Sequence, residues 1–222
     1  MRWILNIHRA MNIYNVIILD ESGSMSSIYK ETLQSINEVL GGIRKTQEEI
    51  PEQKHNVTLV TFEGSGIKGV KIRRDRVPVS EVEDFGEKDY RPGGCTPLYD
   101  AMGQTLNRLE GLVGAEDKVM VTIITDGYEN SSQEYSGSTV KSLVARLREK
   151  GWVFAYVGAN QDAVEVARGL DIPNALNYDS TPEGMLEMRF SVRQACEKMS
   201  KGMAKKKGPG FFDRLFEEME DA

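Results

Sequence analysis

The hydrophobic positions of this chain alternate between short, nearly continuous apolar runs and stretches in which apolar residues recur at helical spacing. Four apolar runs rich in β-branched residues are predicted to form buried strands: residues 13–19, 57–62, 119–125 and 152–157. A weaker run at residues 175–178 predicts a last strand. Between these runs, apolar residues such as Leu33, Ile36 and Leu40 lie three or four positions apart, which predicts amphipathic helices.

This alternation of strands and helices indicates the fold class. Strands that are apolar on both faces and separated by amphipathic helices favour an α/β fold, in which a doubly wound, mostly parallel, Rossmann-like sheet has helices on both faces. The glycine-rich residues 64–69 join the strand at 57–62 directly to a charged strand at 70–73, so we expect a hairpin and one antiparallel edge strand. Residues 64–69 also match the dinucleotide fingerprint G-x-G-x-x-G, but that motif requires a following helix, which the sequence does not predict.

A change of composition near Lys201 divides the chain. We expect one domain over residues 13–200, preceded by an N-terminal extension at residues 1–12. After Lys201 come several lysines, a Gly-Pro-Gly break and an acidic segment whose apolar residues have helical spacing. Residues 201–222 are therefore predicted to be a flexible basic linker and an acidic amphipathic tail, suited to docking into another chain and to self-association.

Composition and charge exclude several classes of function. The 222 residues include 28 Lys and Arg against 34 Asp and Glu, and this formal net charge of -6 is unfavourable for binding nucleic acid. The chain has no run of about 18 apolar residues that could span a membrane, and its first residues lack the pattern of a signal peptide. Cys95 and Cys196 form no C-x-x-C pair and fit a reducing compartment. We expect a cytoplasmic protein that binds neither nucleic acid nor membranes.

Three polar loops lie where a doubly wound sheet binds ligands, at the carboxyl ends of its strands. Their oxygen-bearing side chains are Asp20, Ser22 and Ser24 after the first strand, Thr96 before a helix, and Asp126 after the strand at 119–125. Carboxylates and hydroxyls, without Cys or His, suit a hard divalent cation such as Mg2+, with Mn2+ or Ca2+ as alternatives. Four neighbours are expected to surround the site: Glu21, Tyr128, Glu129 and Asn130. They could tune the choice of partner, but such residues are more often simply solvated.

The runs NVIILDESGSM, GGCTPLYDAM and VTIITDGYENSS resemble the von Willebrand factor A domain and its metal-ion-dependent adhesion site, or MIDAS. The order and spacing of these motifs are similar from about Ile13 to Met199. The resemblance implies a complete MIDAS motif for Mg2+, formed by Asp20, Ser22, Ser24, Thr96 and Asp126. It also implies a protein-binding module in which an Asp or Glu of a protein partner completes the metal shell. Without an export signal, the chain is more similar to intracellular bacterial members than to secreted adhesins.

Simpler interpretations stay open for single residues. Asp20 and Asp126 would also serve as strand-end turn formers, and Ser24 and Thr96 as helix N-caps. A phosphoryl-transfer enzyme of the haloacid dehalogenase type also places an aspartate after its first strand, as the nucleophile, but has a second aspartate where this chain has Ser22. The sequence contains neither a P-loop nor a G-x-S-x-G motif. We expect a protein that is not an enzyme, with metal-dependent phosphoryl transfer by Asp20 as the alternative.

Overall fold

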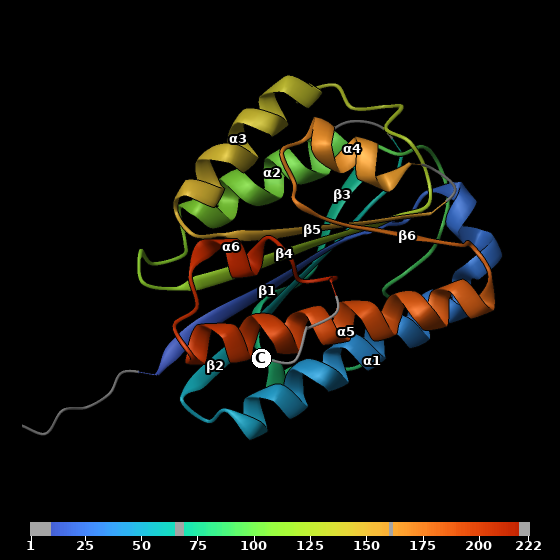
Figure 1. The fold of residues 1–222 in the computed structure, drawn as a ribbon. Coiled ribbons are helices and arrows are strands. Elements are labelled where there is room, and N and C mark those ends of the chain that lie inside the picture. Colours follow the sequence, from blue (N-terminus) through green and yellow to red (C-terminus); the bar gives the residue numbers. More distant parts are fainter. Residues whose placement is uncertain (1–9, 65–68, 160–161, 218–222) are drawn as a thin grey trace, which may run out of the picture.

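The computed structural model describes residues 10–64, 69–159 and 162–217, and in this part of the chain the strands form one six-stranded sheet with helices on both faces (Figure 1). Its strands are β1 (Met11–Asp20), β2 (Gln53–Phe62), β3 (Val70–Pro78), β4 (Lys118–Thr125), β5 (Val153–Ala159) and β6 (Asn174–Tyr178). Every run predicted to be a strand is found, and most strands extend beyond the predicted runs. The predicted N-terminal extension, residues 1–12, is described only from Ala10, and Met11 and Asn12 already belong to β1.

The strand order is β3-β2-β1-β4-β5-β6, with β1, β2, β4, β5 and β6 parallel and β3 antiparallel to β2. This confirms the predicted fold class, including its single antiparallel edge strand. The chain winds from β1 to one side through β2 and β3, and then to the other side through β4 to β6. The order therefore reverses between β1 and β4, which is where sheets of this kind place their ligands.

Helices cover both faces of the sheet, so the central strands are apolar on both sides. In Figure 1, α1 (Tyr29–Glu49) and α5 (Pro182–Ala204) lie on one face, and α2 (Leu98–Glu110), α3 (Gly137–Glu149) and α4 (Ala163–Gly169) lie on the other. Strand β1 alternates between two cores, because Ile13 and Ile17 pack under α1 and α5 while Val16 and Ile18 pack under α2 and α3. None of the described helices is long and apolar enough to cross a membrane.

The C-terminal segment differs from the predicted flexible linker. Helix α5 continues past Lys201 to Ala204, and the following residues, which include the short helix α6 (Pro209–Phe212), return to the body of the domain. The side chain of Asn174 donates to the Phe212 carbonyl at 2.9 Å and accepts from the Leu215 amide at 2.7 Å. Leu215 itself is buried in the core beneath α5. Apolar burial thus holds the described part of this segment, up to Glu217, on its own domain, and self-association stays a prediction.

A buried polar network lies beneath α5 in place of apolar packing. The side-chain nitrogen Nδ2 of Asn15 lies 3.2 Å from His55 Nδ1, and His55 Nε2 lies 3.2 Å from the side-chain oxygen Oε1 of Gln53. The Gln53 side chain in turn donates to the Ser200 carbonyl of α5 at 2.8 Å. These contacts fit a neutral imidazole that accepts at Nδ1 and donates at Nε2. Burial lowers the pKa of His55 to about 4 from its ordinary value of 6.5.

We expect His55 to make the folded protein less stable in acid. Below about pH 6.5 the unfolded chain binds a proton at His55 more readily than the folded chain does. The free energy of unfolding should therefore lose about 3 kcal/mol from this residue as the pH falls from about 7 to about 4. Urea unfolding of the wild type and of His55→Gln over this range measures the effect, since the variant should lack it. Identical pH dependence in the two proteins would contradict the expectation.

Candidate metal site

The five oxygen-bearing residues predicted from the sequence lie together at the carboxyl edge of the sheet. Asp20 is the last residue of β1, Asp126 follows β4, and Thr96 precedes α2. Ser22 and Ser24 lie at the start of the 3-10 helix η1 (Gly23–Ile28), which leads into α1. The structure thus brings together side chains that are up to 106 positions apart in the chain.

Hydrogen bonds link the first and third loops directly. The Ser24 hydroxyl donates to Asp126 Oδ1 at 2.5 Å and lies 3.2 Å from the Ser22 hydroxyl. Asp20 accepts from the Ser22 amide at 2.7 Å through Oδ1 and from the Thr125 hydroxyl at 2.6 Å through Oδ2. These contacts hold the end of β1 against the end of β4.

Thr96 of the second loop completes the cluster. A Cβ atom placed on Gly127 would lie 3.5 Å from the Thr96 hydroxyl and 3.8 Å from the Ser24 hydroxyl, so both hydroxyls lie against the Gly127 backbone. The loop that carries Thr96 approaches closely because Gly94 accepts from the Gly23 amide through its carbonyl, at 3.1 Å. Gly94 has a φ of 69°, and a Cβ there would lie 2.8 Å from the Gly64 amide nitrogen, so only glycine fits this position.

The two carboxylates of the cluster have no cationic partner in the described part of the chain. Burial, with a smaller contribution from the nearby Asp126, raises the pKa of Asp20 to about 6, while the hydrogen bonds from Thr125 and Ser22 act to lower it. Burial also raises the pKa of Asp126, while the hydrogen bond from Ser24 lowers it. Among the described residues, neither carboxylate forms an ion pair with Lys or Arg. Two acidic groups in a buried site without a basic side chain are suited to a cation from solution.

The donor set limits which cation fits. No group of three or more His, Cys, Asp or Glu side chains able to hold a metal occurs within residues 10–64, 69–159 and 162–217. A metal at this cluster would therefore need the hydroxyls of Ser22, Ser24 and Thr96, together with water, in addition to the two carboxylates. Oxygen-only donors and retained waters are the preference of Mg2+ and related hard cations, so these residues fit such an ion.

Glu21, between Asp20 and Ser22, was expected near the site, but its burial and its ion pair were not predicted. It was expected to be solvated, yet its side chain is fully buried and accepts from Arg73 of β3 at 3.0 Å and 2.8 Å. It also accepts from the Arg91 amide at 2.6 Å. Glu21 therefore ties the first loop to the edge strand and to the loop that leads to Thr96. No local pattern indicated this pair, because the register of the β2–β3 hairpin decides which basic residue faces Glu21.

Asn130 and Glu129 were also expected to be solvated, and the structure gives both a positioning role. The side-chain oxygen of Asn130 accepts from the backbone N–H of Thr96 at 2.9 Å. The backbone N–H of Asn130 donates to the Thr96 carbonyl at 3.2 Å. Glu129 accepts from the Tyr99 amide at 2.9 Å, in the first turn of α2. The loop after Asp126 thus holds Thr96 in place through both its backbone N–H and its backbone carbonyl. Tyr128, by contrast, is 58% exposed, as expected.

Asp100 is a further buried carboxylate that the sequence analysis did not consider. It lies in the first turn of α2, is fully buried and accepts from three consecutive backbone amides: Gln133 at 2.8 Å, Glu134 at 2.9 Å and Tyr135 at 2.8 Å. Satisfying three amides with one carboxylate holds the long loop between β4 and α3 over the start of α2.

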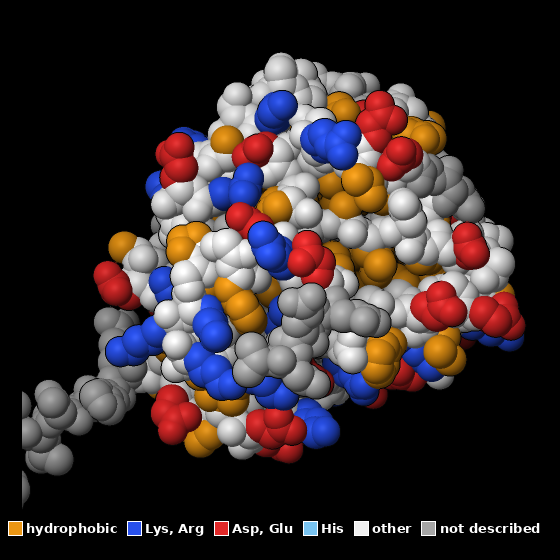
Figure 2. Space-filling model, viewed as in Figure 1, with side chains coloured by type: hydrophobic (Ala, Val, Ile, Leu, Met, Phe, Trp, Pro, Cys, Tyr) orange, Lys and Arg blue, Asp and Glu red, His pale blue; other side chains and the backbone are white. Residues whose placement is uncertain are grey.

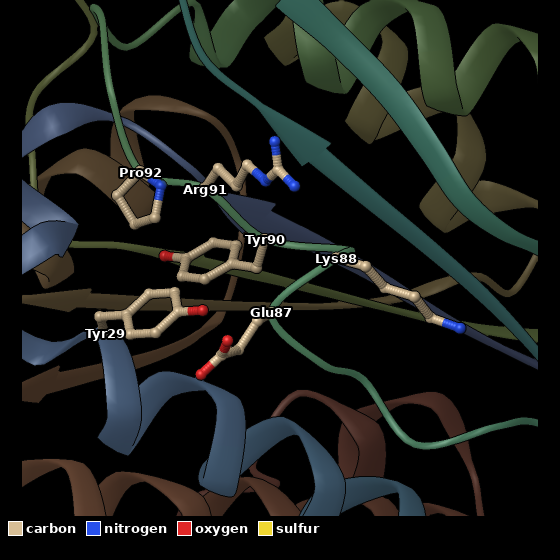
Figure 3. A pocket seen from close by; sticks show the side chains of 6 residues that line it. All are labelled: Tyr29, Glu87, Lys88, Tyr90, Arg91 and Pro92. Atoms are coloured by element: carbon tan, nitrogen blue, oxygen red, sulfur yellow. The ribbon is translucent and has the colours of Figure 1, made fainter.

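An open hollow of about 610 Å³ borders the first loop, lined by Tyr29, Glu87, Lys88, Tyr90, Arg91 and Pro92. Figure 3 shows the rings of Tyr29 and Tyr90 side by side, with Pro92 next to Tyr90 and the Lys88 side chain directed away from them. The two rings are stacked, with centroids 5.9 Å apart. The Tyr90 hydroxyl donates to the Asp20 carbonyl at 2.8 Å, so the wall of this hollow is joined to the end of β1.

Comparison with known proteins identifies the fold and the family. The family model of the von Willebrand factor type A domain matches residues 16–180. Among solved structures, proximal thread matrix protein 1 from the mussel byssus is similar at a TM-score of 0.59 and 17% identity, over 84% of this chain and 46% of that protein. The open conformation of the pilus adhesin SpaC from Lactobacillus rhamnosus GG is similar at a TM-score of 0.64 and 12% identity, over 85% of this chain and 30% of the adhesin.

The chain spans less than half of the length of either protein, and identities this low show a shared fold alone. No curated protein sequence matches the chain significantly.

We expect Asp100→Asn to loosen the site by weakening the support of the loop between β4 and α3. The substitution preserves the size of the side chain but replaces a carboxylate, which accepts hydrogen bonds from three backbone amides, by a neutral amide. The free energy of unfolding should therefore fall by about 2 to 3 kcal/mol. Urea unfolding measures this loss, and Asp84→Asn is the matched control. The Asp84 side chain is 76% exposed and pairs with Arg44 at the surface, so its loss should cost less than about 1 kcal/mol. Equal losses in the two variants would refute the role of Asp100.

Proposed function

This chain belongs to the von Willebrand factor type A domain family, and we propose that it is a metal-dependent protein-binding module with a MIDAS-type site. Domains of this family are generally interaction modules rather than enzymes, and they typically bind a divalent metal. The proposed ligands are Asp20, Ser22, Ser24, Thr96 and Asp126, and the proposed ion is Mg2+, with Mn2+ or Ca2+ as alternatives. The observation that carries the proposal is a cluster of three hydroxyls and two carboxylates that has no basic partner among the described residues.

The charge balance of this cluster explains how it would bind a protein. Three of the five proposed ligands are neutral hydroxyls, and the two carboxylates together carry only as much negative charge as a divalent ion carries positive charge. Where one or both carboxylates bind the ion through water, its directly bound ligands are mostly neutral. A bound divalent cation would supply an under-neutralised positive charge, to which an Asp or Glu side chain of a partner is attracted in place of a water. Ser24 and Gly94 are exposed at the cluster, so a partner side chain has access to it from solvent. The neighbouring hollow at Tyr29 and Pro92 offers further surface for the same partner.

The alternative function, phosphoryl transfer with Asp20 as the nucleophile, has less support. The Asp20 side chain is fully buried, and both of its carboxylate oxygens already accept hydrogen bonds. The Thr125 hydroxyl occupies one oxygen, and the position of the expected general acid is held by Ser22. A cytoplasmic location and an intracellular bacterial type stay predictions from the sequence.

Metal binding is the first expected outcome. Mg2+ at about a hundred times its dissociation constant should stabilise the wild type by about 2.7 kcal/mol, because only the folded state assembles the site. Asp20→Asn and Asp126→Asn should lose most of this gain, measured by urea unfolding with and without Mg2+. Ser26→Ala changes an exposed serine of η1 and is the control, which should keep the gain. If both aspartate variants respond to Mg2+ as the wild type does, the proposed ligands are wrong.

Metal-dependent partner capture is the second expected outcome. The immobilised wild type should retain a protein partner from its native lysate in Mg2+ and release it on addition of EDTA. Asp126→Asn should fail to retain the same protein, whereas Ser26→Ala should retain it. Replacing the acidic residues of the captured protein one at a time should identify a single Asp or Glu that is required. Capture that is unaffected by EDTA would contradict the proposal, and hydrolysis of p-nitrophenyl phosphate that Asp20→Asn abolishes would favour the alternative.

A further inference from the structure

A second cavity lies at the opposite end of the sheet from the metal site. Its volume is about 430 Å³, within the range of about 300 to 1,000 Å³ that is common for small-molecule sites. It is lined by Met11, Lys118, Arg148, Gly151, Trp152, Val153, Phe154, Met203, Lys206, Lys207, Pro209, Phe212 and Asp213. The lining residues come from the amino ends of β1, β4 and β5, from the ends of α3 and α5, from the segment that joins α5 to α6, and from α6 and Asp213 after it, at the left in Figure 1.

The apolar part of the cavity comes from the sheet end and the C-terminal segment. Trp152 and Phe154 stack with ring centroids 6.5 Å apart, and both are almost fully buried. Met203 and Phe212 contribute from α5 and α6, on the other side of the cavity. Because Trp152, Phe154 and Met203 are nearly buried, most of the accessible apolar surface comes from Met11, Pro209 and Phe212. A ligand placed here would contact these groups and the exposed edge of Trp152.

Hydrogen bonds and ion pairs fix the wall that α6 forms. Asn174 bonds the backbone of Phe212 and of Leu215, as described above. Arg148 pairs with Asp171 at 2.8 Å and with Asp213 at 3.2 Å. The backbone on this side of the cavity is thus held in place before a ligand binds. Binding would therefore cost little conformational entropy of the protein.

The charged residues of the lining are unbalanced. Four are cationic and one, Asp213, is acidic, and that acid already pairs with Arg148. Lys118, Lys206 and Lys207 form no ion pair in the part of the chain that the structure describes. Lys207 lies over the ring of Phe211 instead, 5.9 Å from its centroid. Figure 2 shows this face of the molecule, where Lys and Arg side chains gather beside hydrophobic groups around α6.

We propose that this cavity binds a small amphipathic anion, a medium-chain alkyl carboxylate, with its chain on the apolar wall and its carboxylate among the three lysines. The apolar half of the lining matches the alkyl chain of such a ligand, and the cationic half matches its carboxylate. A simple anion would leave the apolar wall without a contact, and a cationic amphiphile would be repelled by the lysines. The proposal is independent of the metal site, since no residue is shared by the two.

The tryptophan of the cavity provides a direct test. The sequence contains two tryptophans, so in Trp3→Phe the emission excited at about 295 nm, where tyrosine hardly absorbs, comes from Trp152. Decanoate, titrated below its micelle concentration, should change this emission in a saturable way. Inorganic phosphate and decyltrimethylammonium at the same concentrations should not. The absence of a saturable response to decanoate, or an equal response to either control compound, would overturn the proposal.

Lysine variants test the charged half of the cavity in the same Trp3→Phe background. Replacing Lys206 and Lys207 by Gln should weaken decanoate binding at least about fivefold, whereas replacing the exposed Lys30 and Lys141 should not. Unchanged affinity in the first double variant would overturn the proposal. A variant that lacks residues 1–9 should bind decanoate as Trp3→Phe does. If decanoate binds only after that deletion, the N-terminal segment is the natural occupant and the proposed ligand class is wrong.

Discussion

The burial of a carboxylate at the end of the central strand is the constraint on which the carboxyl edge of the sheet depends. Asp20 is fully enclosed, and its two oxygens accept from the Ser22 amide and the Thr125 hydroxyl. These bonds define the path of the first loop and its distance from β4. A buried negative charge is costly without compensation, and no described basic side chain supplies it. The geometry of the loops and the fit of the site to the proposed cation therefore have the same origin.

Other buried carboxylates hold the rest of this edge in place. Glu21 joins the first loop to β3 through Arg73, and Asp100 gathers three amides of the loop before α3. Asn130 bonds both polar backbone atoms of Thr96. The proposed ligands thus rest on supporting residues from several elements. Such preorganisation is what a site made largely of weak, neutral hydroxyl ligands requires.

The two ends of the sheet differ in charge and in surface chemistry. The carboxyl edge presents acidic and hydroxyl groups, whereas the amino edge presents three unpaired lysines beside aromatic side chains among the described residues. The C-terminal segment creates the second of these environments, because Leu215 buries itself beneath α5 and brings α6 over the sheet end. Residues 201–217, whose composition predicted a separate linker and tail, therefore pack on the domain and form one side of the cavity.

The sequence by itself determined the alternation of strands and helices, the antiparallel hairpin and the three loops with oxygen donors. It did so because strand periodicity, helical spacing and the D-x-S-x-S motif are local patterns, which can be recognised from residues close together in the sequence. Only the tertiary structure decided that Glu21 faces Arg73, that Asn130 holds Thr96 and that Leu215 is buried. Those partners lie far apart in the chain, and their contacts follow from strand register and packing, which a local pattern of residues does not specify.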